Sequence, residues 1–422
     1  MTKTHEALSA SETRPSALVV LRNRAVLRFF LARTIALLGS SMAPVALAFA
    51  ALTMPGGSAT DLGVVLMARA FVQILFLLVG GVVADHWERR RVMVLSDVTA
   101  GCTQTAIAAL VMAGSATTLS LALLSMVSGA AAAMFDPAAR SLMPSLVGTD
   151  SLQTANALLR SSIRTATIAG TALAGVLVAG IGPGQTLAVN AATFLVSAFL
   201  VASIPLRGRS GYRPSAAGPS FLHLLRTGWR EFISRRWVWP SVVQLGLVNV
   251  LLAGPFFVLG PVVAQREMGG ASAWATVSTA QALGFVVGSV LAIRLRPRFP
   301  LRVTALLTMG FPLPLFLLGA TRSLAAVAIA SFLAGVCIDV YDVLLETTLQ
   351  RHVPEEALAR VMSYETLGSF AMVPVGLAVV GPVSALAGTG TTLLAAACVI
   401  VMTGPLLLLV PAVRRFRHEP TP

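Results

Sequence analysis

Charged residues, and lysine above all, are scarce in this sequence. Of its 422 residues, 11% are charged and 56% are hydrophobic, and the mean hydropathy is +0.82. Soluble globular domains carry about 25% charged residues, so the composition excludes an ordinary soluble protein. The only lysine is Lys3, which excludes a GxxxxGK[ST] phosphate-binding loop and a lysine Schiff base. ATP therefore cannot drive the protein through its own chain.

Cysteine and histidine are also too few and too scattered to indicate a metal or redox site. Cys102, Cys337 and Cys398 lie singly in apolar runs, which argues against a disulfide framework. The five histidines show no HExxH spacing, and no G-x-S-x-G sequence is present. Because no nucleophile stands near a partner base, we predict that the protein is not an enzyme and uses no cofactor or metal.

Long apolar runs dominate what is present. Each run has about 20 residues or more, enough to cross a hydrocarbon core of about 30 Å. Backbone groups in lipid must bond within their own segment, and no run alternates like a barrel strand, so every span is expected to be a helix. The twelve expected spans are 27–52, 60–84, 92–114, 118–142, 157–180, 185–205, 240–263, 271–293, 302–321, 323–349, 362–386 and 390–412.

Basic residues gather in every second break between these spans. Arg89, Arg90 and Arg91 form one group, and Arg207 to Arg236 form another. The alternate breaks PGGSATD, GSATT, GIGPG and GTGT carry no base. By the positive-inside rule, this pattern predicts a multi-pass protein of a bacterial cytoplasmic (inner) membrane with both termini cytoplasmic. It also accounts for the excess of 31 Lys+Arg over 17 Asp+Glu without nucleic acid as a partner.

The chain matches itself at an offset of about 206 residues, which indicates an internal repeat. Phe135-Asp136 falls on Tyr341-Asp342, and the glycines at 170 and 175 fall on those at 376 and 381. We expect an all-α membrane protein with two pseudo-symmetric six-helix bundles. The expected parts are a cytoplasmic segment at 1–26, a first bundle at 27–205, a linker at 206–239, a second bundle at 240–412 and a tail at 413–422.

The linker between the halves contains FLHLLRTGWREFISRRW after a Gly, Ser and Pro-rich start. Phe221, Leu224 and Phe232 follow a helical period, with Arg226 and Arg230 elsewhere on the turn. This pattern predicts an amphipathic helix on an anionic membrane surface, and a solvated basic linker is the alternative.

The segment GGVVADHWERRRVM, residues 80–93, resembles the loop between helices two and three of the major facilitator superfamily. Gly81 matches the first glycine of that motif, Asp85 its acid, and Arg89 and Arg90 its basic pair. His86 and Glu88, in contrast, stand where the motif has a base and a second glycine. The resemblance implies a gate at the cytoplasmic end, and a plain positive-inside loop is the alternative reading.

Two further stretches resemble the branch of drug, macrolide and siderophore exporters, which are drug:proton antiporters. They are FDPAARSLMPSLV at 135–147 and LETTLQRHVPEEALARVMSYETLGS at 345–369. The likeness runs from about residue 25 to 412. Glu365, a turn into the eleventh span, is expected to join the gate or to cap that helix.

The stretch CIDVYDVLLETTLQ, residues 337–350, places three carboxyls in one apolar span. At 100° per residue, Asp339, Asp342 and Glu346 fall within about 60° of one helix face. An ionised carboxyl near the middle of a span costs about 2.5 to 3.5 kcal/mol on insertion scales. This face should therefore line a wet cavity or make a buried polar contact between helices.

Partners for these acids are expected on other spans. Asp136, one repeat earlier, would face them across the pseudo-two-fold if the fold is that of the superfamily. Arg69 and Gln73, four residues apart, are the best basic partner surface. Arg33 is a second candidate, or it extends to the inner headgroups.

These features predict a secondary active transporter working by alternating access, with proton-coupled efflux of a lipophilic or amphiphilic small molecule such as a drug, antibiotic or siderophore. Asp339 is the first choice for the proton carrier because of its depth, and Asp342 the second because the repeat echoes it. The expected partners of this monomer are substrate, protons and the lipid bilayer. A proton-coupled importer of a nutrient and a non-transporting membrane receptor are the alternatives.

Overall fold

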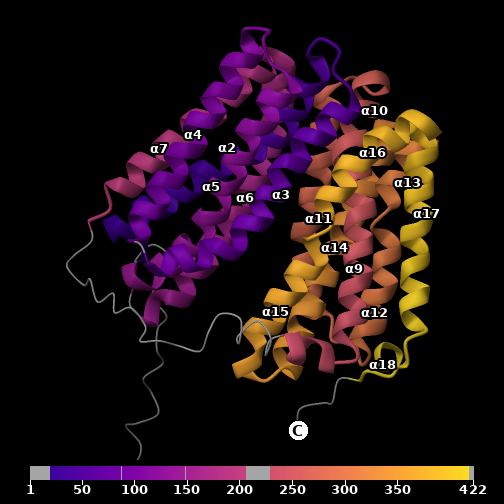
Figure 1. Ribbon diagram of the computed structural model, residues 1–422. Coiled ribbons are helices and arrows are strands. Elements are labelled where there is room, and N and C mark those ends of the chain that lie inside the picture. The colour runs from indigo at the N-terminus through magenta and orange to yellow at the C-terminus, as the bar shows by residue number, and fades with distance from the viewer. Residues whose placement is uncertain (1–19, 87, 148, 206–228, 418–422) are drawn as a thin grey trace, which may run out of the picture.

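The structure is a computed structural model that describes residues 20–86, 88–147, 149–205 and 229–417. Within these ranges the regular structure is entirely helical, and twelve helical segments are long and apolar enough to cross a membrane. The predicted all-α fold with twelve spans is confirmed. Figure 1 shows the spans gathered into two bundles, one from each half of the chain.

The first bundle holds six unbroken helices, and five of them begin before the expected apolar runs. The helix expected at 157–180, for example, begins eight residues earlier, because its polar first two turns continue the helix. Thr117 caps another helix with its hydroxyl and forms a capping box with Ser120. The bundle comprises α2 (Arg24–Thr53), α3 (Ala59–His86), α4 (Arg89–Met112), α5 (Thr118–Leu146), α6 (Thr149–Ile181) and α7 (Pro183–Ala202).

The second bundle contains three spans that are interrupted near proline. Proline lacks an N–H and its ring clashes with the preceding turn, so Pro255, Pro312 and Pro374 stand where the helix changes form or restarts. Asn249 Nδ2 donates to the Ser369 carbonyl at 2.9 Å, next to one break. The elements are α9 (Val238–Gly254), the π turn η1 (Pro255–Leu259), α10 (Gly260–Glu267), α11 (Ala271–Arg294), α12 (Pro300–Leu307), the 3-10 turn η2 (Thr308–Gly310), α13 (Leu313–Ala320), α14 (Leu324–His352), α15 (Glu355–Phe370), α16 (Val373–Ala387), α17 (Thr389–Leu408) and α18 (Pro411–Arg414).

Glycines bring equivalent helices of the two bundles into close contact. A Cβ on Gly129 of α5 would lie 2.5 Å from the Arg69 carbonyl oxygen of α3. A Cβ on Gly335 of α14, at the repeat offset, would lie 2.3 Å from the Gln281 carbonyl oxygen of α11. The same small-residue contact therefore fixes α3 on α5 and α11 on α14.

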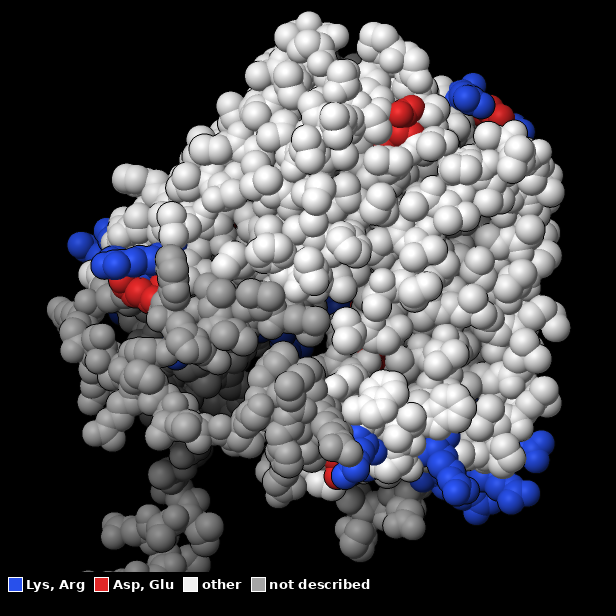
Figure 2. Space-filling view, in the orientation of Figure 1, with Lys and Arg blue, Asp and Glu red and all other residues white. Residues whose placement is uncertain are grey.

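The two ends of the molecule differ in charge. We call the end with the turns at 54–58, 113–117, 268–270 and 321–323 the neutral end, where Glu267 pairs with Arg322. The end with the turns at 88, 295–299 and 409–410 is the basic end. Most of the face seen in Figure 2 is uncharged. Phe199 and Ile293 are among the exposed large apolar side chains of the described residues, as a lipid-facing surface requires.

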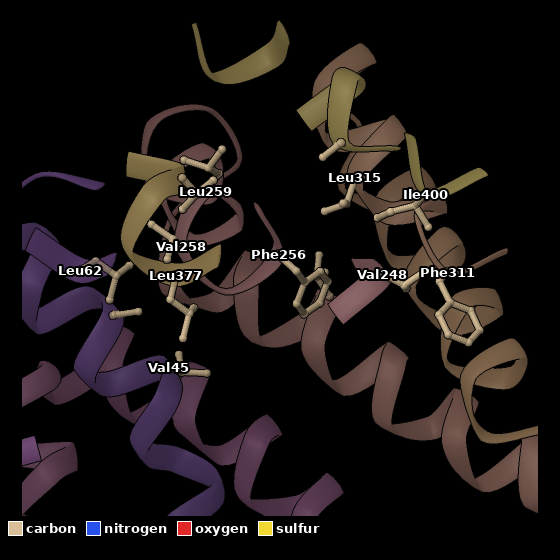
Figure 3. Close-up of a cluster of buried hydrophobic side chains, with 14 of the residues drawn as sticks. Val45, Leu62, Val248, Phe256, Val258, Leu259, Phe311, Leu315, Leu377 and Ile400 are labelled. Carbon is tan, nitrogen blue, oxygen red and sulfur yellow. The ribbon is translucent and has the colours of Figure 1, made fainter. Parts of the chain in front are cut away.

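The bundles meet closely toward the neutral end, with α3 against α16 and α6 against α11. A Cβ on Gly381 would lie 2.5 Å from Thr60 Cα, and one on Gly63 would lie 2.4 Å from the Leu377 carbonyl oxygen. Hydrophobic side chains gathered here and drawn in Figure 3 include Val45, Leu62, Val258 and Leu377. In Figure 1 the bundles diverge from this contact toward the basic end.

Only the last part of the expected amphipathic linker helix is described. Residues 229–234 are helical, and Trp229 and Phe232 pack against each other and against Tyr364 of α15. The remainder of the predicted helix, with Phe221 and Leu224, lies outside the described residues. The described turn is attached to the second bundle through these three rings.

Candidate functional site

A cavity of about 590 Å³ opens in the second bundle, between α9, η1, α11, α14 and α15. Its wall combines five phenylalanines with three carboxylic acids, and no lysine, arginine or histidine lines it among the described residues. The π turn at 255–259 places two consecutive aromatic rings on this wall. The polar and aromatic lining residues are Asn249, Phe256, Phe257, Gln281, Phe285, Phe311, Asp342, Glu346, Glu365, Thr366 and Phe370.

Two acids of the predicted face on α14 reach this cavity. Asp342 and Glu346 both line it and both are exposed within the bundle. Gln350 Nε2 donates to Glu346 Oε1 at 3.1 Å, whereas Asp342 has no hydrogen bond or ion pair within the described part of the chain. Their carboxyls border open space as the insertion cost required, because lipid would have left them unsolvated.

Glu365 of α15 lines the same cavity. Ser369 Oγ donates to its Oε1 at 3.1 Å and Thr366 Oγ1 to its Oε2 at 3.3 Å. It lies within electrostatic range of Asp342 and Glu346. Three like charges around one hollow repel each other, so this site favours a cation or a bound proton.

Asp339, one turn deeper, does not line the cavity with its neighbours. Its side chain is 6% exposed, and Arg164 Nη2 of α6 lies 2.9 Å from its Oδ1. Ser289 Oγ of α11 donates to Oδ2 at 2.5 Å. Asp339 and Arg164 both lie near the middle of their helices, so this ion pair joins the two bundles about halfway along α14 and α6.

The other predicted partners are placed elsewhere. Arg33 pairs with Asp136 within the first bundle, and its guanidinium lies 4.9 Å from the centre of the Phe135 ring. Arg69 is half-buried on α3 without an ion pair or hydrogen bond among the described residues, and Gln73 is exposed. In this conformation Arg164, and not Arg69 or Gln73, supplies the counter-charge for Asp339.

The predicted gating motif is described only in part. Gly81 and Asp85 belong to the side chains at 77–86 that lie outside the described residues. Arg89 Nη1 donates to the Ser141 carbonyl at 2.8 Å, and Arg90 Nη1 to the Ile204 carbonyl at 3.1 Å. The motif arginines thus hold the start of α4 against the carboxyl-terminal ends of α5 and α7, where a cation is favourable.

Sequence reasoning missed Arg164 and the buried pair of Asp97 and Ser197. Arg164 was not predicted as a partner of the acids, although it lies fifteen residues into α6. Asp97 of α4 is 2% exposed, and Ser197 Oγ of α7 donates to its Oδ2 at 2.6 Å. The position of Arg164 inside an apolar run could have identified it as a buried base. Asp97 lies so close to the basic residues at 89–91 that the sequence does not mark it as buried.

Curated relatives cover most of the chain. Multidrug efflux pump Tap of Mycolicibacterium fortuitum is 25% identical over 380 residues, which are 85% of this chain and 89% of Tap. Enterobactin exporter EntS of Salmonella typhi is 26% identical over 396 residues, 93% of each chain. Both relatives are transporters rather than enzymes.

Solved structures share the fold at low identity. The nucleoside transporter NupG aligns with a TM-score of 0.75 and 13% identity, over 93% of this chain and 100% of its own. A bacterial homolog to human lysosomal transporter Spinster, inward-facing and unoccupied, aligns with a TM-score of 0.72 and 16% identity, over 95% and 99%. The Major Facilitator Superfamily model matches residues 29–377. This chain therefore belongs to the Major Facilitator Superfamily of membrane transporters.

Proposed function

We propose that this protein exports lipophilic, positively charged small molecules in exchange for protons. The observation that carries the proposal is the cavity of the second bundle, where Asp342, Glu346 and Glu365 stand among five aromatic rings with no base among the described lining residues. Aromatic faces and carboxylates together attract an organic cation.

The same carboxyls explain the exchange. A cation neutralises the repulsion between the acids, and a proton does the same, so the two compete for one site. A proton arriving from one side of the membrane displaces a substrate that came from the other. Exchange of one proton for one singly charged substrate moves no net charge, so the pH gradient drives it. Each further proton exchanged adds about 2.3 kcal/mol per 100 mV of membrane potential.

Alternating access is supported by where the bundles touch. The glycine contacts at Gly63 and Gly381 close the neutral end, while the bundles diverge toward the basic end. With the basic end in the cytoplasm, this arrangement admits substrate from inside. The Arg164–Asp339 pair lies between the bundles at mid-depth, where a change in relative position must stretch it.

Export is favoured over import by the relatives, which are named as an efflux pump and an exporter and match most of this chain. A proton-coupled importer is the second candidate, because the cavity acids serve either direction. A non-transporting receptor would not require carboxyls open to the cavity.

The test uses everted membrane vesicles containing the full chain and the fluorescent cation ethidium. We expect ethidium to accumulate inside vesicles whose lumen is acid, and Asp342→Asn and Glu365→Gln to abolish this accumulation. Glu267→Gln is the matched control, because it removes a carboxyl at the neutral end, far from the cavity. Loss of ethidium from preloaded vesicles under the same gradient would establish import, and gradient-independent behaviour would refute proton coupling.

A further inference from the structure

A second carboxyl site lies in the core of the first bundle, separate from the cavity. Asp97 is 2% exposed on α4, and its donor Ser197 on α7 is fully buried. No cation lies within ion-pair distance of Asp97 in the part of the chain that the structure describes. A hydroxyl alone does not compensate a buried carboxylate, so the ionised form of Asp97 is disfavoured as the structure stands.

One cation is near enough to change this. Arg33 of α2 interacts electrostatically with Asp97 while its Nη2 pairs with Asp136 of α5, whose side chain is 50% exposed. The other charged group on α5 is Arg140, which is exposed at the basic end, and α7 carries none. The cluster thus holds two carboxyls and one guanidinium, and it is neutral only with one proton bound.

The second bundle provides an internal control for this corner of the fold. Thr403 falls on Ser197 at the repeat offset of about 206 residues. There, Gln244 Nε2 donates to Thr308 Oγ1 at 3.0 Å and to Thr403 Oγ1 at 3.2 Å. The partner of the equivalent hydroxyl is thus a neutral amide on α9, and residue 303, at the repeat offset from Asp97, is a valine. The repeated fold therefore does not require a carboxyl at this place.

We propose that Asp97 is a second proton-binding site of the transporter, loaded when Arg33 pairs with Asp136 and emptied when Arg33 turns to Asp97. In the emptying step the O–H bond of the Asp97 carboxyl breaks and the proton passes to water. The carboxylate takes Arg33 as its counter-ion, and the half-exposed Asp136 is left to water. This role in exchange rests on the proton coupling proposed above, whereas proton binding by Asp97 does not.

Infrared spectroscopy of the reconstituted full chain tests the binding step without any substrate. At neutral pH the wild type should show the C=O stretch of a protonated carboxyl, and Asp97→Asn should remove one such component. Asp136→Asn should remove it too, because Arg33 is then free to pair with Asp97. Ser197→Ala and Glu267→Gln should retain it. An unchanged carboxyl band in Asp97→Asn would overturn the proposal.

Proton counting tests the exchange step, with ethidium as the probe in proteoliposomes. We expect Asp97→Asn to exchange one proton fewer per ethidium than the wild type, with ethidium self-exchange retained at zero gradient. An unchanged ratio would overturn the role of Asp97 in exchange while leaving the proposed function intact. A wild type that moves ethidium without protons would instead overturn the proposed function, and the infrared band would still decide whether Asp97 binds a proton.

Discussion

The two bundles repeat one fold but distribute their charges differently. In the first, acids lie beside a base, as Asp136 beside Arg33, and Asp97 is buried with a hydroxyl. In the second, Asp342 occupies the place of Asp136 in the repeat and faces an open cavity without a base. Backbone packing is shared because it depends on glycines at equivalent positions, whereas the ionisable side chains are free to differ. This difference is in line with the proposed roles, in which the second bundle binds the substrate and the first binds a proton.

The largest expected effect comes from preventing the bundles from closing on each other. Gly381→Val would place side-chain atoms onto Thr60, whose Cα already lies 2.5 Å from the position of a Cβ. Overpacking of this kind costs about 1–3 kcal/mol, and a value near 2 lowers the ratio of closed to open molecules about 30-fold. We expect ethidium transport to be lost and a cysteine introduced at the neutral end to become reactive toward aqueous thiol reagents.

A matched control for this substitution is Gly180→Ala on α6. A Cβ at Gly180 meets nothing within 4 Å, so this variant should transport normally. Normal transport by Gly381→Val would mean that the glycine contact seen here is not part of the working cycle.

The next effect concerns the ion pair between Arg164 of the first bundle and Asp339 of the second. Arg164→Gln leaves Asp339, 6% exposed, with Ser289 as its remaining partner. Breaking a buried pair costs about 3–5 kcal/mol, and we expect about 1–3 here because Arg164 is half exposed. Adding Asp339→Asn should restore much of the stability, as measured by thermal unfolding in detergent. A double variant no more stable than Arg164→Gln would show that the pair has no net coupling.

Much of this fold follows from the sequence, because crossing a bilayer imposes strict length and hydrogen-bond requirements. The helix breaks in the second bundle were not predicted, since a proline in an apolar run does not always break the helix, as Pro44 in α2 and Pro137 in α5 show. The insertion cost of carboxyls led us to expect Asp342 and Glu346 beside open space, and both line the cavity. Their role in proton coupling remains a prediction.

The pairing of the acids could not be deduced in the same way. Arg164 and Asp339 are 175 residues apart, and which base meets which acid depends on how the two bundles are tilted. Asp97 lies eight residues after the start of α4, a depth from which a side chain reaches either the headgroups or the bundle core. The packing of α7 on α4 decides which of these two environments the Asp97 side chain enters. The periodicity of the sequence does not reveal this packing.

A smaller effect, on ethidium affinity, should distinguish Asp342 from Asp136, the equivalent acid of the first half. Asp342→Asn removes a charge from the cavity, so we expect ethidium affinity to fall about tenfold, which corresponds to about 1.4 kcal/mol. Asp136→Asn should leave ethidium affinity unchanged, because Asp136 pairs with Arg33 in the other bundle. Fluorescence titration of the purified variants measures both values. Equal losses of affinity would show that the two halves share the cargo site.

The smallest effect, on stability, should distinguish Thr403 from Ser197, the residue at the equivalent position of the first bundle. Thr403→Val removes one acceptor of Gln244, which keeps its bond to Thr308, so unfolding should become easier by about 0.5–1.5 kcal/mol at any pH. Ser197→Ala removes the donor to Asp97, and a hydroxyl stabilises an ionised carboxylate more than a neutral carboxyl. Its destabilisation should therefore grow as the pH rises. Thermal unfolding of both variants at acidic and alkaline pH measures this difference, and a pH-independent loss in Ser197→Ala would mean that Asp97 does not change protonation over that range.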